Sequence, residues 1–412
     1  MNHLNDTGLS QRSIGLLLLL FLFMLSKYNF YIGFALKPYM IFLLLFLLFH
    51  LSIFSFQKLH LYESVLLLFY LFYSFTGAFS VYPFASLRFT LGIILLIFFY
   101  FILRFFLDAY SDDTIQKTVC RTGLLFNAVS LLLYVLGLKS FGLQVQGELE
   151  SSYGVLWDRD YPRLIGLLED PNLYIFYNTI FFTCCLTNTK KWGNKIGFIL
   201  CLVTNALTFS RGGILAMLLV ILIYMVISNA AKRWRIMIVM GAGVSVVGYL
   251  ATSIMKFDIG RLLEGRIKDF SSDGGSGRFE LWSRAWDYFL AHPLMGIGAD
   301  NFIEYNIVHY GEKLYTHNTF LQILSESGLL GFSLYFTFLL LVFFRLMNRR
   351  LIREKPYLLL SFIAFLLQIM SLSLIINEAF FLYLAILSVI LQKEERKQLI
   401  EKQKIKDFQL TY

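Results

Sequence analysis

Residues 89–107 read FTLGIILLIFFYFILRFFL, a run of 19 residues whose single charge is Arg104. An α-helix rises about 1.5 Å per residue, so a run of this length crosses the roughly 30 Å hydrocarbon core of a bilayer. The stretch therefore predicts a transmembrane helix, and the number of similar runs decides the fold.

Similar apolar runs recur along the whole chain. With 58% hydrophobic and 15% charged residues and a mean hydropathy of +0.66, the composition is well above the roughly 45–50% apolar share of a soluble domain. We therefore predict an all-α integral membrane protein, in which residues 1–412 form one polytopic membrane domain. The twelve predicted spans cover residues 14–34, 39–56, 62–79, 89–107, 118–138, 172–187, 196–210, 213–228, 236–255, 329–345, 357–375 and 378–391.

The distribution of basic residues predicts the orientation of these spans. Lys and Arg near span ends are retained in the cytoplasm, and 22 of the 36 basic residues fall on one side when both termini are placed there. Residues 392–412 then form a cytoplasmic basic tail, and two long loops, 139–171 and 256–316, lie outside the cytoplasm. We attribute the net charge of +9 to attraction by anionic lipid, and predict no nucleic-acid partner.

The second long loop contains its own amphipathic pattern. Apolar residues recur at helical spacing over residues 279–290, and Ser276 and Gly277 precede them as an N-terminal cap. Two tryptophans, Trp282 and Trp286, belong to this pattern. The predicted helix either lies on the membrane surface or packs on the membrane spans.

Two arginines at the predicted outer boundary are candidates for ligand binding. Arg211 stands in Thr208-Phe209-Ser210-Arg211-Gly212-Gly213 between two short apolar runs, where a charge needs a partner or a ligand. Arg278 stands in the first turn of the loop helix, against the helix dipole, where an anion would meet it and the free backbone N–H groups. The alternatives are a snorkelling arginine at a turn and an exposed arginine without a role.

His317 is the candidate for acid–base chemistry. A neutral imidazole can remove a proton from a hydroxyl, whereas a lone histidine is more often a capping or core residue. We expect Thr316 to cap the helix that His317 begins, with Asn318 next to it. Glu326 follows within the next apolar segment, and we expect an arginine as its partner.

The remaining polar motifs indicate less by themselves. Arg163 and Gly166 precede Asp170-Pro171-Asn172, in which Asp170 fits a helix cap and Pro171 a first helical turn. Asp158-Arg159-Asp160 could mimic a metal-binding pair of carboxylates, but we predict neither a metal nor another cofactor. The four cysteines show no metal-ligand spacing and predict no disulfide framework.

Together the motifs resemble those of the O-antigen ligase and Wzy-type polysaccharide polymerase family. Four pieces occur in order over residues 163–331. They are Arg163-x-x-Gly166 with Asp170-Pro171-Asn172; Ser210-Arg211-Gly212-Gly213; Gly277-Arg278 followed by Leu281-Trp282, Pro293, Gly296 and Gly298; and His317-Asn318 followed after nine residues by Gly328-Leu329-Leu330-Gly331.

The resemblance implies a metal-independent bacterial membrane glycosyltransferase of the GT-C type, in the plasma (inner) membrane. Such an enzyme transfers oligosaccharide from undecaprenyl pyrophosphate to a glycan hydroxyl on the extracytoplasmic face. Matched to this sequence, Arg163, Arg211 and Arg278 would bind pyrophosphate and His317 would be the base. Three supporting residues complete the expected site: Asn172, Asn318 and Glu326.

The exact reaction is left open by the sequence. A capsular, exopolysaccharide or O-antigen repeat-unit polymerase is favoured by the resemblance to capsule and exopolysaccharide members. An O-antigen ligase that transfers glycan to lipid A core is the alternative. Expected partners are the lipid-linked donor, a glycan acceptor, membrane lipids, a flippase and a chain-length regulator. A lipid-linked oligosaccharide transporter is the competing class, but it predicts internal repeats and mid-membrane charges, which the sequence lacks.

Overall fold

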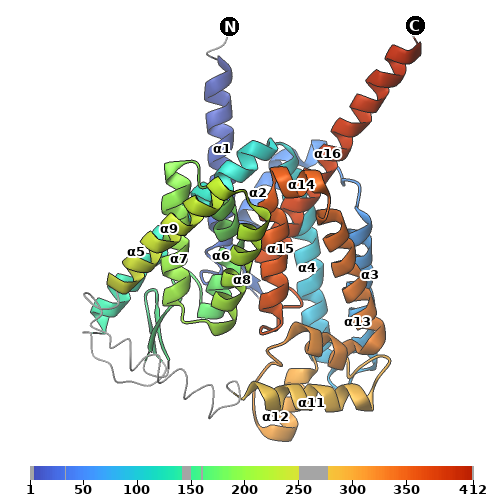
Figure 1. Ribbon diagram of the computed structural model, residues 1–412. Coiled ribbons are helices and arrows are strands. Elements are labelled where there is room, and N and C mark those ends of the chain that lie inside the picture. Colours follow the sequence, from blue (N-terminus) through green and yellow to red (C-terminus); the bar gives the residue numbers. More distant parts are fainter. Residues whose placement is uncertain (1–3, 33, 142–149, 159–160, 250–276, 411–412) are drawn as a thin grey trace.

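The computed structural model describes residues 4–32, 34–141, 150–158, 161–249 and 277–410, and most of them are helical (Figure 1). The longer helices are α1 (Leu4–Phe23), α2 (Pro38–His50), α3 (Leu61–Thr76), α4 (Pro83–Asp108), α5 (Asp112–Ser140), α6 (Pro171–Thr187), α7 (Trp192–Leu207), α8 (Arg211–Ile227), α9 (Ala230–Tyr249), α11 (Arg278–Ala291), α12 (Phe302–Tyr310), α13 (Thr319–Leu346), α15 (Pro356–Ile369) and α16 (Glu378–Leu410). Shorter pieces are η1 (Leu51–Ile53), η2 (Gly77–Phe79) and α14 (Arg349–Glu354).

Each of the twelve predicted spans overlaps one of these helices, yet fewer satisfy a strict membrane criterion. Four helical stretches among the described residues are long and apolar enough to cross a bilayer: Leu61–Phe79, Pro83–Asp108, Asp112–Ser140 and Thr319–Leu346. Four others are apolar but shorter, at 10–17 residues. The chain is therefore a mostly helical membrane protein, whereas twelve crossings and a GT-C fold stay predictions.

Helix α6 forms the centre of the bundle. Asp170 caps it and Pro171 occupies its first turn, as predicted, and the helix is buried from Tyr174 to Leu186. It packs against α5, α7, α8 and α15. Buried amides join three of these helices, because Asn178 on α6 donates to Asn127 and Asn205 at 2.9 and 2.8 Å. Such bonds between helices satisfy polar groups that lipid cannot.

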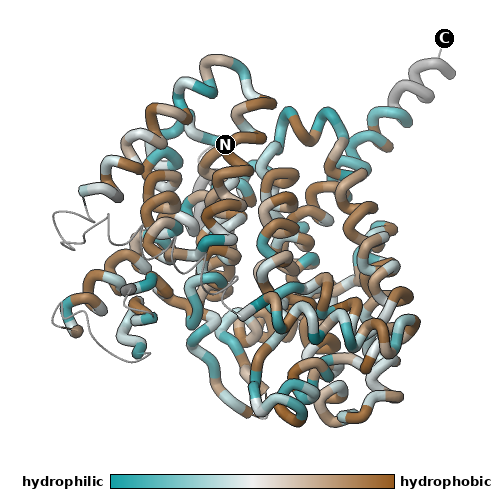
Figure 2. The backbone as a smooth tube through the Cα atoms, turned by 60° about the horizontal axis from the view of Figure 1, so that its bottom comes forward, coloured by the Kyte–Doolittle hydropathy of each residue, from teal (hydrophilic) through white to brown (hydrophobic). Residues whose placement is uncertain are grey.

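The two ends of the bundle differ. Figure 1 shows both termini at one end, which we call the terminal end, and the β3–β5 strands with α11 and α12 at the other, which we call the loop end. In Figure 2 the middle parts of the bundle helices are mainly hydrophobic, and hydrophilic residues gather toward the ends and on the last helix. For the described residues, this arrangement agrees with the prediction that both termini lie on one side and both long loops on the other.

The all-α prediction needs a correction, because short antiparallel strands are present. Strands β1 (Phe30–Tyr31) and β2 (Ala35–Leu36) pair with each other. In the first long loop, β3 (Glu150–Ser152), β4 (Val155–Asp158) and β5 (Tyr161–Leu164) form a three-stranded sheet. The sequence showed no clear alternation there, since strands this short carry little periodic signal.

The amphipathic helix predicted in the second loop is confirmed as α11, although its buried face is rotated. Leu281 and Ala285 are buried against Ile297 and Phe302, which belong to the same loop end. Trp286 keeps 47% of its surface exposed. The helix thus packs on neighbouring segments through one face and leaves aromatic surface on another.

Candidate active site

The turn between α7 and α8 places Arg211 at the loop end. Ser210 is the N-cap residue of α8, and its N–H donates to the Thr208 hydroxyl at 3.2 Å. Phe209 has a positive φ of 51°, an uncommon conformation for an aromatic residue. At Gly213 a Cβ would lie 2.3 Å from the side chain of Ile175 on α6, so only glycine permits this close packing. Arg211 is therefore the first residue of a helix held tightly against α6.

Arg163 on β5 is held by three protein groups. Its guanidinium donates to Asp158 at 2.8 Å, to the Thr208 carbonyl at 3.0 Å and to the Asn172 side-chain oxygen at 3.4 Å. These contacts fix β5 against the α7–α8 turn. The guanidinium is thus already engaged, which sequence reasoning did not anticipate because it overlooked Asp158 as a partner.

Asn172 joins the first two motifs. Its side-chain oxygen accepts from the Ser210 hydroxyl at 2.7 Å as well as from Arg163. Asn172 lies just before the buried part of α6, at the place where β5, α6 and the α7–α8 turn meet. The structure therefore brings together Arg163, Asn172 and the Ser210–Arg211 turn, which are far apart in sequence.

His317 lies just outside α13 in a strained conformation. Its φ is 49°, in the left-handed region that costs a non-glycine residue of the order of 1–3 kcal/mol. The expected cap was wrong: Asn318, and not Thr316, is the N-cap, and it accepts from the N–H groups of Phe320 and Leu321 at 3.0 and 3.1 Å. The buried Thr316 hydroxyl is instead 2.9 Å from that of Ser373.

Burial and two neighbouring charges act on His317. Burial lowers the pKa of His317 below its ordinary value, Arg278 lowers that pKa further, and Asp170 opposes both effects. Arg278 and Asp170 are thus both within electrostatic range of the imidazole. The lowered pKa keeps the imidazole neutral at pH 7, the form that accepts a proton.

Helix α11 carries Arg278 toward this histidine. Gly277 precedes the helix with a φ of 72°, and Arg278 is its first residue. The indole N–H of Trp282 donates to the Thr316 carbonyl at 3.0 Å, which ties α11 to the segment immediately before His317. One hydrogen bond thus fixes the two motifs relative to each other.

Glu326 has partners other than those expected. Its carboxylate accepts from the Tyr73 hydroxyl and, at 3.1 Å, from the N–H of Phe302, the first residue of α12. The prediction of an arginine partner is wrong, because the tyrosine and a helix N-terminus satisfy this buried carboxylate. Glu326 therefore organises the second loop, and its hydrogen bonds go to α3 and α12 rather than to His317.

The remaining glycine landmarks lie against each other. Leu329 N–H donates to the Pro293 carbonyl and Gly298 N–H to the Glu326 carbonyl, both at 2.9 Å. A Cβ at Gly296 or at Gly328 would lie 2.3 Å from backbone of the opposite segment. These motif residues thus join the segment after α11 to the bend in α13.

Asp300 is a further titratable group that sequence reasoning missed. It has a φ of 55°, and burial raises its pKa to about 7, with Arg88 lowering and Glu304 raising it. Its backbone N–H donates to the Tyr73 hydroxyl at 3.1 Å. A carboxyl that titrates near neutrality at the loop end can exchange protons under working conditions.

The proposed carboxylate pair for a metal is only partly described, since Arg159 and Asp160 lie outside the described residues. Asp158 is the partner of Arg163. Within the described parts of the chain, no group of three His, Cys, Asp or Glu side chains is placed to hold a metal ion.

Comparison with known proteins identifies one related family. Residues 196–336 match the family model described as O-antigen ligase. The matched region contains Arg211, Arg278 and His317, whereas Arg163 lies before it. No curated protein matches the chain. The match confirms the predicted resemblance over this region.

Proposed function

We propose that this chain, whose residues 196–336 carry the likeness to the membrane glycosyltransferases of the O-antigen ligase and Wzy-type family, transfers oligosaccharide from undecaprenyl pyrophosphate to a glycan hydroxyl. This likeness supports glycan ligation or polymerisation in general. The donor, the acceptor and the residue roles are our proposal. The reaction takes place at the loop end, on the extracytoplasmic face of the bacterial inner membrane.

The observation that supports the proposal most is the pairing of a neutral histidine with a nearby arginine. His317, with its lowered pKa, accepts the proton of the acceptor hydroxyl as that oxygen attacks the anomeric carbon of the donor sugar. The new glycosidic bond forms as the bond between that carbon and the pyrophosphate oxygen breaks. Undecaprenyl pyrophosphate leaves with the electron pair.

The arginines stabilise the negative charge that develops on the pyrophosphate. Arg211 and Arg278 bind it at the first turns of α8 and α11, where backbone N–H groups add to the positive field. Arg163 keeps its bonds to Thr208 and Asn172 and exchanges Asp158 for a phosphate oxygen. Asn172 holds the α7–α8 turn that carries Arg211, and Asn318 caps α13, the helix that follows His317. Glu326 holds the second loop. No metal takes part in the proposed step.

The proposed reaction has two candidate acceptors. We favour a repeat-unit polymerase, in which the acceptor is another lipid-linked repeat and a flippase and chain-length regulator are partners. The description of the matching family model favours an O-antigen ligase, in which the acceptor is lipid A core. The residues described above bind the donor and do not distinguish these acceptors.

The test uses the purified chain in proteoliposomes that contain undecaprenyl-pyrophosphate-linked oligosaccharide. One sample has no other glycan, and the second also has lipid A core. Longer lipid-linked chains in the first sample support the polymerase, and glycan joined to lipid A in the second supports the ligase. Movement of donor between leaflets without any new glycosidic bond would establish the transporter and reject the transferase.

A further inference from the structure

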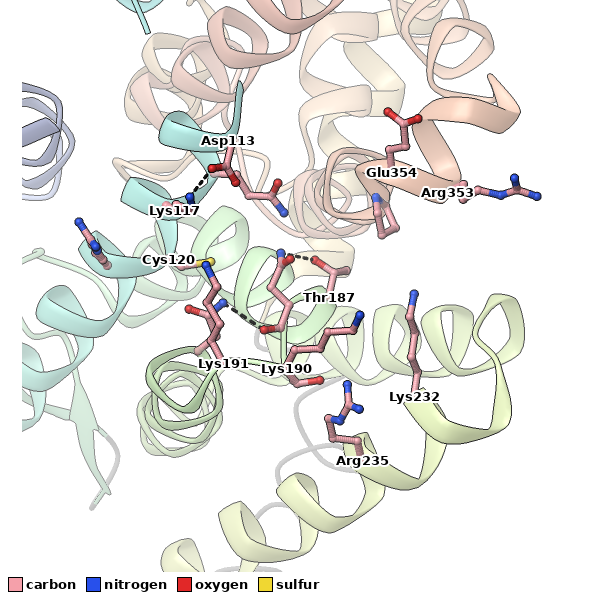
Figure 3. A pocket seen from close by; sticks show the side chains of 16 residues that line it. Asp113, Lys117, Cys120, Thr187, Lys190, Lys191, Lys232, Arg235, Arg353 and Glu354 are labelled. Carbon is pink, nitrogen blue, oxygen red and sulfur yellow. Dashed lines mark hydrogen bonds and ion pairs between the residues drawn. The ribbon is translucent and has the colours of Figure 1, made fainter. Parts of the chain in front are cut away.

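A cavity of about 560 Å³ opens at the terminal end, far from the candidate active site. Its wall is formed by the start of α5, the turn between α6 and α7, the first turns of α9, and the α14–α15 junction. Figure 3 shows Lys190, Lys191, Lys232 and Arg235 around it, with Arg353 on another element. The volume lies within the roughly 300–1,000 Å³ range of small-molecule sites.

The charge of this wall is strongly positive. Seven basic and two acidic side chains line the cavity. Both acidic groups are engaged, since Asp113 pairs with Lys117 and Glu354 pairs with Arg350, which lies outside the wall. Among the residues that the structure describes, the other six basic side chains make no ion pair with a carboxylate: Arg121, Lys190, Lys191, Lys232, Arg235 and Arg353.

Three other basic residues at the same end do pair with carboxylates. Lys355 pairs with Asp112, Arg345 with Glu395, and Arg396 with Asp108. Retention of positive charge on the cytoplasmic side accounts for the number of Lys and Arg residues here. It does not account for cations from four places in the fold meeting around one cavity whose two carboxylates are already paired, because the mutual repulsion of the other cations destabilises the folded chain.

An anionic ligand would remove this repulsion. The wall also contains the buried Thr189 and the half-buried Asn194, whose hydroxyl and remaining amide hydrogen can donate to oxygen atoms of a ligand. We propose that this cavity binds a phosphate group, because clustered Arg and Lys side chains suit an anion with several acceptor oxygens. This site is separate from the proposed reaction and exists whether or not that reaction is correct.

The surroundings favour a lipid as the source of the phosphate. A second cavity of about 370 Å³ shares Lys232, Arg353 and Pro356 with the first. Its other wall residues include the apolar Ile227 and Ile352. An amphipathic molecule could place its headgroup among the cations and its glycerol and upper chains along this neighbouring surface. A soluble phosphate would use the first cavity alone.

The experiment compares two double variants of the full chain that each remove two positive charges from the terminal end. Lys190→Gln with Lys191→Gln changes the cavity wall. Lys397→Gln with Lys402→Gln changes two exposed residues of α16 and serves as the matched control. Each protein is placed in nanodiscs of phosphatidylcholine and phosphatidylglycerol, and the lipids retained after extraction are measured by native mass spectrometry. Inorganic pyrophosphate binding is measured separately by calorimetry in detergent.

We expect the wild type and the α16 variant to retain phosphatidylglycerol over phosphatidylcholine. The cavity variant should lose this preference by about tenfold or more, since each cation near an anionic headgroup contributes on the order of 1 kcal/mol. Arg235→Gln alone should give a smaller loss, which keeps the test valid if the double variant does not fold. The wild type could instead bind pyrophosphate but show no lipid preference, with the cavity variant losing the pyrophosphate binding. That result would support the phosphate site and assign it to a soluble ligand. Equal loss of lipid preference in both double variants, or no binding of either probe, would overturn the proposal.

Discussion

Cationic side chains gather at both ends of this bundle, but the two ends hold them differently. At the loop end, Arg163 is fixed by three protein acceptors, and His317 and Arg278 are joined through the bond between Trp282 and Thr316. At the terminal end, seven basic side chains surround an open cavity, and among the described residues six of them, Lys190 and Arg235 included, have no carboxylate partner. Fixed groups suit a chemical step, whereas repelling groups around a cavity suit the binding of an anion.

The difference also concerns backbone strain. Phe209, Asp300 and His317 have left-handed backbone conformations, and all three belong to turns at the loop end. Strain of this kind persists only where the surrounding contacts enforce it, and it is common at functional sites. Among the described residues, no non-glycine residue that lines the basic cavity has a positive φ. The loop end is therefore the more constrained of the two.

The largest expected contrast is accessibility from outside the cell. Cysteine placed at Lys313, at the loop end, should be labelled fully by an impermeant thiol reagent on intact cells. Cysteine placed at Lys397, at the terminal end, should be labelled only after lysis. The four native cysteines are buried and give little background. Labelling of position 397 alone on intact cells would reverse the orientation and place the basic cavity outside.

Removal of the proposed base should have the next largest effect. His317→Ala should lower glycan transfer by about 10² to 10⁴, while donor binding changes little because the arginines remain. Radiolabelled donor separates product formation from binding in the same sample. His309→Ala, an exposed histidine on α12, is the matched control and should transfer normally. Normal transfer by His317→Ala would leave this histidine with a structural role only.

Replacement of an arginine by lysine tests whether the loop end binds phosphate by a fixed geometry. Arg211→Lys keeps the charge but loses the two-pronged donor, so transfer should fall by about 10- to 100-fold. Arg88→Lys is the control, since that side chain is 75% exposed and contacts Glu304. Full activity of Arg211→Lys, measured by the same donor assay, would show that the loop end needs only a positive charge and no fixed geometry, as we propose for the terminal end.

The smallest effect concerns pH. Because burial and Arg278 lower the pKa of His317 below its ordinary value of 6.5, more than half of the imidazole is neutral at pH 6.5. Transfer at pH 6.5 should therefore exceed half of its plateau and fall only at lower pH. Burial raises the pKa of Asp300 to about 7, so Asp300→Asn should be measured in parallel to remove that titration. A half-maximum above 6.5 that persists in Asp300→Asn would contradict the role of His317.

The sequence predicted the helices well because each apolar run carries its own signal. All twelve runs overlap helices, and the cap at Asp170 and the helix containing Trp282 were found from local patterns. The partners of Glu326 were missed because Tyr73 lies 253 residues away, and only the packing of α3 on α13 brings it there. The effect of Asp170 on His317 was missed for the same reason. By contrast, Asp158 lies only five residues from Arg163 and was missed because the short β4–β5 hairpin was not predicted. The site residues themselves were identified by resemblance, and their roles are still predictions.

The interlock between Gly296 and Gly328 has a consequence for biosynthesis. The segment after α11 makes backbone bonds with residues 325–330, which the ribosome adds about 30 residues later. The second loop therefore reaches its final form only after the first part of α13 has been delivered to the membrane. Until then the newly translocated loop lacks its supporting partner. A glycine-to-alanine change at either position would act first as a defect of assembly, seen as lower protein yield, before any loss of activity per molecule.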